Sequence, residues 1–176
     1  MSLTPADLIR MTRAERETLY AASPAGPIPE GETCGYGLAG SWLFVRWFLV
    51  VFARLFLWQG KLFRKSEGGL INRILPPGFL GIRAQVYEGA SWVDGKPAVF
   101  LDYSKTSFLA RAIHDEIRQV APDLYLGKVW WGKTPLVHFA LRTHTPPRYG
   151  GPIRLVRLAL ILGGTAFWWA RATGRI

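Results

Sequence analysis

His114, Asp115 and Glu116 form a run of three titratable side chains. Histidine and carboxylate groups are common ligands of transition metals in proteins. The apolar residues around the run recur at helical spacing, which predicts a helix over Thr106–Val120. Consecutive helical residues point in different directions, so these three side chains cannot converge on one metal ion. We therefore expect them on the solvated face of a helix.

The other residues that could take part in catalysis or metal binding are scattered along the chain. Tyr103 and Lys105 lack the three-residue spacing of a Tyr/Lys dehydrogenase pair, and His138 and His144 are six residues apart, one on an expected strand and one in a loop. Cys34 is the only cysteine, which excludes a disulfide scaffold and a four-cysteine zinc site. The chain has no glycine-rich phosphate loop. The sequence thus predicts a non-catalytic protein with no metal site, no catalytic residue and no cofactor.

Lys128, Trp130, Trp131 and Lys133 alternate cations with aromatic rings, as in platforms that stack single-stranded nucleic acid. Adjacent strand residues point to opposite faces of a sheet, so only one of the two tryptophans could stack on a base. The two long apolar stretches described below would have no use in a nucleic-acid module. We therefore expect no nucleic-acid partner.

The charge is strongly basic and unevenly distributed. The 176 residues hold 22 Lys and Arg against 12 Asp and Glu, a formal net charge of +10. No acidic residue lies between Thr33 and Ser66, and none follows Asp123. This segregation predicts attraction to phosphate groups, here anionic lipid headgroups, and a generally basic surface is the alternative.

The first apolar stretch, Ser41–Trp58, has only Arg46 and Arg54 as charged residues. As a helix it would span about 27 Å, close to the ~30 Å thickness of a bilayer core. Each central arginine would cost ~2.5–3.5 kcal/mol in lipid. We therefore expect a deeply seated interfacial helix, or a span whose arginines meet a protein partner. A helix buried in a soluble core is the alternative.

The second apolar stretch, Leu158–Ala170, carries no charge over thirteen residues. Arginines lie on both sides of it, and the Gly163–Gly164 pair would let another helix approach closely. We predict a C-terminal transmembrane or membrane-inserted helix, with packing on a soluble domain as the alternative. The expected membrane or partner contacts in the two stretches are Trp42, Arg46, Trp47, Phe48, Phe52, Arg54, Phe56, Arg157, Gly163, Gly164, Phe167, Trp168, Trp169 and Arg171.

Between the apolar stretches the pattern indicates two β-hairpins with a helix between them. Asp94–Gly95 is a strong hairpin-turn signal, and Gly132–Lys133 is a weaker one. This order predicts an α+β fold in which a small antiparallel β-sheet with one packed helix is flanked by two apolar membrane-seeking helices. The expected regions are 1–40 (short helices and a Pro/Gly-rich loop), 41–58 (membrane-embedded or interfacial helix), 59–152 (α+β domain) and 153–176 (C-terminal membrane helix).

Residues 58–141 resemble small bacterial lipocalin-like domains of unknown function named for a Gly-x-Trp-x-Gly signature. Phe56 stands where that signature has its first glycine. The resemblance implies a curved antiparallel sheet able to hold an apolar ligand, and it supplies no catalytic residues and does not specify the ligand-binding ones. The motifs that carry it are Trp58–Phe63, Leu101–Tyr103, Asp115–Arg118 and Leu124–Gly127.

These patterns together predict a non-catalytic membrane protein that docks on and stabilises a larger membrane assembly, such as a respiratory or photosynthetic complex. The start of the chain is polar and contains acidic residues, which argues against a signal peptide. With the many arginines, this favours a membrane localisation with the α+β domain on the cytoplasmic side. The alternative function is a lipocalin-like protein that binds lipid or another apolar ligand at the membrane surface.

Overall fold

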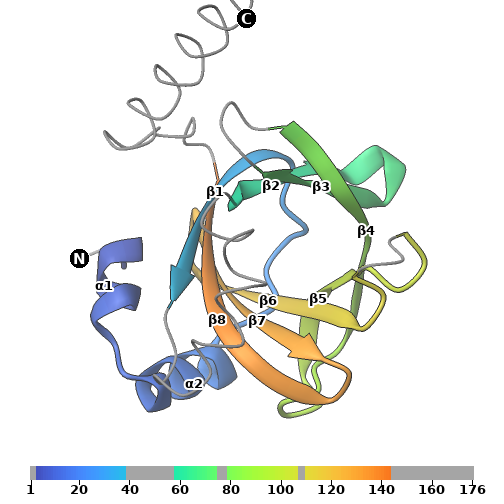
Figure 1. The fold of residues 1–176 in the computed structure, drawn as a ribbon. Coiled ribbons are helices and arrows are strands. Elements are labelled where there is room, and N and C mark those ends of the chain that lie inside the picture. The colour runs from blue at the N-terminus through green and yellow to red at the C-terminus, as the bar shows by residue number, and fades with distance from the viewer. Residues whose placement is uncertain (1–2, 39–57, 75–78, 107–109, 144–176) are drawn as a thin grey trace, which may run out of the picture.

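Antiparallel strands dominate the computed structural model, which describes residues 3–38, 58–74, 79–106 and 110–143. Eight strands close into one barrel, and two short helices precede them (Figure 1). The helices are α1 (Pro5–Arg10) and α2 (Arg13–Ala22). The strands are β1 (Gly31–Leu38), β2 (Trp58–Arg64), β3 (Gly69–Ile74), β4 (Phe79–Ala90), β5 (Pro97–Asp102), β6 (Ile113–Ala121), β7 (Leu124–Trp131) and β8 (Thr134–Thr143), with a 3₁₀ turn at Lys65–Glu67.

Each strand pairs with the next one along the chain, and β8 returns to pair with β1. The closing register runs from Thr33 opposite Thr143 to Leu38 opposite His138. Because closure pairs both edges of the sheet, no barrel strand is left as an open edge. Both predicted hairpins are confirmed, with Gly95 at φ 72° and Gly132 at φ 54° in the turns between β4 and β5 and between β7 and β8.

The predicted short helices at the N-terminus are confirmed. Thr4 with Asp7, and Thr12 with Glu15, form capping boxes that satisfy the first backbone N–H groups of α1 and α2. Both helices pack on the outside of the barrel, α1 against β1 and β8 and α2 against β6 and β7 (Figure 1).

Two apolar clusters result from this arrangement. One fills part of the barrel interior with side chains from seven strands, and the other lies between the helices and the outer wall. The interior cluster contains Phe63, Leu70, Ala84, Val86, Val99, Leu101, Tyr103, Ala110, Ile117, Tyr125, Phe139 and Leu141.

The predicted fold class is wrong: the described residues form a closed barrel, not a small sheet with one packed helix. The helix expected over 106–120 is replaced by β6, in which alternate residues face the interior and the outer wall. Asp115 shows why the alternation was hidden, since it places a charged side chain on the interior face of the strand. A strand with a charged residue on its inner face does not alternate regularly between apolar and polar residues.

The structure also corrects the predictions of transmembrane helices, of a membrane protein and of a cytoplasmic-side domain. Within the ranges it describes, no helix has both the length and the apolarity needed to cross a membrane. Residues 41–57 and 153–176 lie outside the described residues, and so do all the contact residues predicted in them, from Trp42 to Arg171.

Candidate functional site

Four polar side chains meet inside the barrel, in one layer next to the apolar interior cluster. Lys61 comes from β2, Asn72 from β3, Asp115 from β6, and Tyr103 follows directly after β5. Lys61 and Asn72 are opposite each other in the β2–β3 register, so their side chains share one face of the sheet. All four residues are buried. We call them the polar layer.

The ammonium group of Lys61 is the centre of the polar layer. Its Nζ donates to Asp115 Oδ2 at 3.0 Å, to Asn72 Oδ1 at 3.0 Å and to the Tyr103 hydroxyl at 2.5 Å. Tyr103 donates in turn to Asp115 Oδ2 at 3.1 Å, and Asn72 Nδ2 donates to the Tyr103 hydroxyl at 3.2 Å. The side chains of Lys61 and Asp115 are only 3% and 5% exposed, so water hardly screens this ion pair.

Burial opposes the charge of these groups. It lowers the pKa of Lys61, while the Asp115 carboxylate acts in the other direction. Burial also raises the pKa of Tyr103 well above its ordinary value, and the negative charge of Asp115 adds to this. Tyr103 is therefore a neutral hydrogen-bonding group at physiological pH.

Two aromatic rings form a wall beside the polar layer. Trp58 and Phe139 meet edge to face with their centroids 5.7 Å apart, and Lys61 Nζ lies 5.3 Å and 5.4 Å from their centroids. Glycines make room for both rings. A Cβ atom at Gly127 would stand 2.2 Å from the Phe139 ring, and one at Gly35 would stand 2.5 Å from the Trp58 ring.

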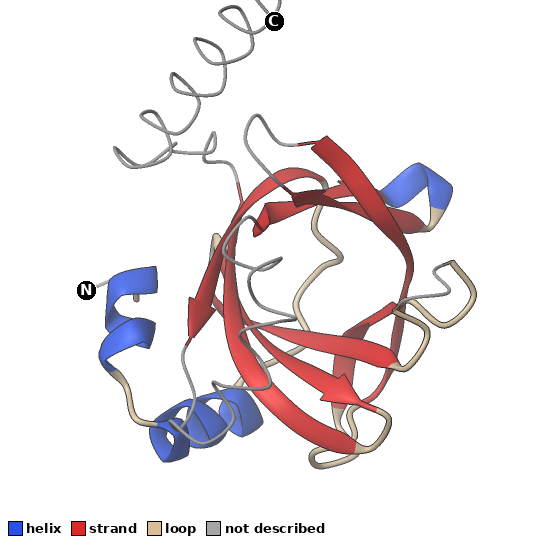
Figure 2. Cartoon of the chain, in the orientation of Figure 1, coloured by secondary structure: helices blue, strands red, loops and turns tan. Residues whose placement is uncertain are grey.

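The two ends of the barrel differ. At one end the segment 24–28 crosses the barrel (Figure 2), where Pro27 accepts a 2.8 Å hydrogen bond from the Tyr125 hydroxyl and Ile28 packs against the interior cluster. At the other end Trp58, Ile113 and Val129 pack on the same cluster but stay partly exposed. The polar layer lies next to this second end, whose three apolar residues we call the rim.

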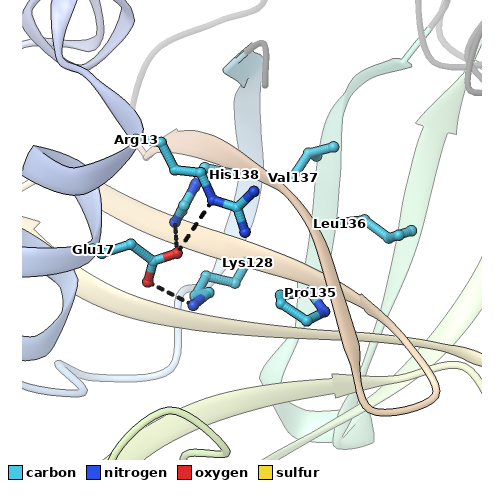
Figure 3. A pocket seen from close by; sticks show the side chains of 7 residues that line it. All are labelled: Arg13, Glu17, Lys128, Pro135, Leu136, Val137 and His138. Carbon is cyan, nitrogen blue, oxygen red and sulfur yellow. Dashed lines mark hydrogen bonds and ion pairs between the residues drawn. The ribbon is translucent and has the colours of Figure 1, made fainter. Parts of the chain in front are cut away.

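A second group of charged residues lies outside the barrel, in a shallow pocket between α2 and the β7–β8 hairpin (Figure 3). Glu17 binds Lys128 Nζ at 2.7 Å and lies 3.4 Å from His138 Nε2 and 3.9 Å from Arg13 Nε. Burial lowers the pKa of His138 to about 4, with Glu17 opposing and Lys128 adding to the shift. Because Glu17 of α2 pairs with Lys128 of β7, the group fastens the helix to the wall.

Arg118 makes a further attachment of α2 on the outer wall. Its guanidinium pairs with both carboxylate oxygens of Asp94, at 2.6 Å and 2.8 Å, and donates to the carbonyl of Tyr20 at the end of α2. It also lies 4.7 Å from the centroid of the Tyr20 ring. This ion pair lowers the pKa of Asp94 to about 2. Arg118 therefore ties the helix to the β4–β5 turn.

Comparison with known proteins gives information on the fold of this chain. The chain matches no protein-family model and no curated protein. It is similar to the crystal structure of a protein from Thermomonospora curvata, with 21% identity over 77% of this chain and 89% of that one and a TM-score of 0.50. At this identity the likeness concerns the fold alone. The antiparallel barrel is consistent with a lipocalin-like fold and with the curved antiparallel sheet that the resemblance implied, whereas membership of the Gly-x-Trp-x-Gly family is not supported.

The sequence drew attention to only half of the polar layer. Asp115 was expected on a solvated helix face, which is wrong because it lies on β6 inside the barrel. Apart from their places in family motifs, Tyr103 was considered only for a dehydrogenase pair and Lys61 was not considered. Asn72 was missed. The available signal was the alternation of Ile113, Asp115 and Ile117, which places all three on one face of a strand.

The other candidates are not brought together in the described part of the chain. His114 lies on the outer wall, where its ring stacks on Trp92 with centroids 4.8 Å apart. No group of three or more metal-ligating side chains occurs among the described residues. Trp130 is buried and Trp131 is 42% exposed, which confirms that only one of the two could stack on a base.

Proposed function

We propose that the barrel binds one small, mainly apolar molecule at the rim end, with the polar head of the molecule on the polar layer. This is the lipocalin-like alternative of the sequence analysis. None of the described residues supports the first expectation, a subunit that docks on a membrane assembly. The proposal concerns binding without turnover.

The observation that carries the proposal is the buried ion pair of Lys61 and Asp115, 3.0 Å apart in a mainly apolar interior. Removing two charges from water costs several kcal/mol per ion, and their mutual attraction often does not recover this. An apolar pair of similar volume would serve stability as well. Charged groups kept at such a place are typical of functional sites.

The surroundings fit a binding site. Known ligand sites have mostly apolar and aromatic walls with a few convergent polar groups. Here Trp58, Phe139, Ile113 and Val129 supply such walls next to the polar layer. An eight-stranded barrel has an interior that is either filled by side chains or able to hold one small ligand. The end that the segment 24–28 crosses is occupied by Ile28, which packs on the interior cluster, so we place the ligand at the rim.

Calorimetric titration of the full chain with medium-chain fatty acids, fatty alcohols and isoprenoids tests the proposal. We expect at least one member to bind with a stoichiometry of one. The Val129→Trp variant should abolish this binding because a larger ring would fill the rim. Tyr87→Trp is the matched control, since Tyr87 is 41% exposed and stacks on Phe100, away from the rim.

Two results would contradict the proposal. One is the absence of binding to every member of the panel while the chain keeps a cooperative unfolding transition. The other is equal binding by the wild type and by a folded Val129→Trp variant, because this would place the ligand elsewhere on the molecule.

A further inference from the structure

The polar layer has used almost all of its hydrogen-bonding capacity. An ammonium group has three donors, and those of Lys61 are taken by Asn72, Tyr103 and Asp115. The Tyr103 hydroxyl donates once and accepts from Lys61 and Asn72. These two side chains therefore have no hydrogen-bonding site left for a ligand.

Asn72 is fully used as well. Its Oδ1 accepts from Lys61 Nζ at 3.0 Å and from Trp58 Nε1 at 3.1 Å. Its Nδ2 donates to the carbonyl of Ile82 at 3.0 Å and to the Tyr103 hydroxyl at 3.2 Å. An amide offers two donors and two lone pairs, so this network also fixes its orientation.

Asp115 is different. Its Oδ2 accepts from both Lys61 and Tyr103, but its Oδ1 accepts no hydrogen bond from any described residue. A carboxylate has about four lone-pair sites, and a side chain that is only 5% exposed cannot leave them all to water. Among the described residues, the unused capacity of the polar layer is thus an acceptor, which a donor on a ligand can fill.

The net charge of the polar layer further restricts the class of ligand. Lys61 and Asp115 neutralise each other, so the polar layer has no net charge. A carboxylate brought next to Asp115 would add a second negative charge in a place that excludes water, and like charges there repel strongly. A neutral hydrogen-bond donor, by contrast, adds no charge, so the polar layer stays without net charge.

We infer that the barrel selects a neutral hydroxyl group as the head of its ligand, which donates to Asp115 Oδ1, and discriminates against the corresponding carboxylic acid. The inference rests on the proposed function and names its ligand class, an apolar alcohol.

The test compares three probes on one carbon skeleton: 1-octanol, 1-methoxyoctane and octanoate, titrated calorimetrically into the full chain at pH 8. The ether keeps the oxygen but has no donor, and the acid is ionised at this pH. A hydrogen bond to a charged group is typically strong enough to change affinity by about tenfold or more. We expect 1-octanol to bind at least about tenfold more tightly than both other probes.

Variants assign the preference to the polar layer. Lys61→Met/Asp115→Leu removes both charges at similar volume, a change that buried ion pairs often tolerate, and it should bind alcohol and ether equally. The control is Arg73→Met/Glu32→Leu, which removes another ion pair of the barrel, 3.0 Å between Arg73 Nη1 and Glu32 Oε2. That variant should keep the preference for the alcohol.

The possible outcomes distinguish failure of this inference from failure of the proposed function. Octanoate or the ether binding as tightly as 1-octanol overturns the inference and leaves the proposed function standing. The same holds if none of the three probes binds while longer lipids do. A preference that survives in the folded Lys61→Met/Asp115→Leu variant also overturns it. Failure of every apolar probe contradicts the proposed function itself.

Discussion

At the scale of single residues, the site depends on two glycines, whose lack of a side chain leaves room for aromatic rings. Gly127 and Gly35 have no side chain, and the rings of Phe139 and Trp58 lie where a Cβ atom would be. The two rings then pack against each other and against Lys61. The position of the lysine ammonium is therefore coupled to two glycines on other strands.

Gly127→Ala should destabilise the protein by about 1–3 kcal/mol, because the new methyl group overlaps the Phe139 ring and a packed core yields only at such a cost. Gly37→Ala is the control, since a Cβ atom there meets nothing within 4 Å; its effect should stay within about 0.5 kcal/mol. Urea unfolding measures both. Equal losses in the two variants would show that the ring does not occupy this position.

At the scale of elements, α2 is attached to the barrel by buried charges on its underside. Glu17 meets Lys128 from β7 and His138 from β8, and Arg118 from β6 meets the end of the helix. The row Glu116, Lys128 and His138 runs across three neighbouring strands in register. The attachment of α2 should therefore respond to acid.

The pKa of His138 determines whether acid lowers or raises the stability of the folded protein. Its pKa is about 4 in the folded protein against 6.5 for the free side chain, so between these values the unfolded chain binds a proton that the folded one does not. Stability contributed by neutral His138 is thus lost as the pH falls from 6.5 towards 4. Between pH 7 and pH 4 the wild type should lose on the order of 1–3 kcal/mol more than His138→Gln.

Denaturant unfolding of both proteins across this range checks the prediction. Glu116, whose pKa is raised by burial, works in the opposite direction because its folded form takes up a proton first as the pH falls. Its contribution is common to both proteins and cancels in the comparison. Identical pH profiles would show that His138 titrates normally in the folded protein.

Some of the helices, strands and turns could be predicted from the sequence, and others could not. The turns around Asp94–Gly95 and Gly132–Lys133 depend on local chemistry, and both hairpins are confirmed. The short helices expected within residues 1–40 are present too, and their capping boxes are also local. β6 was taken for a helix because the charged Asp115 faces the interior and the apolar Val120 packs on the outer wall, which breaks the alternation that identifies a strand.

At the scale of the whole molecule, closure of the barrel creates the site, and closure is not visible in local patterns. Lys61 and Asp115 are 54 residues apart and meet only because the sheet curls until β8 pairs with β1. No spacing rule links such positions, so the polar layer could not be predicted from the sequence. The resemblance to lipocalin-like domains pointed to a curved sheet, and the barrel agrees with it at that coarse level.

The central claim is that a ligand lies at the rim end of the barrel, over the Lys61–Asp115 pair. Intermolecular nuclear Overhauser effects between 1-octanol and methyl-labelled protein measure this most directly. The account predicts contacts from the bound probe to the methyl groups of Ile113 and Val129. Contacts confined to Val93 and Val120, which pack in the cluster between the helices and the outer wall, would contradict it.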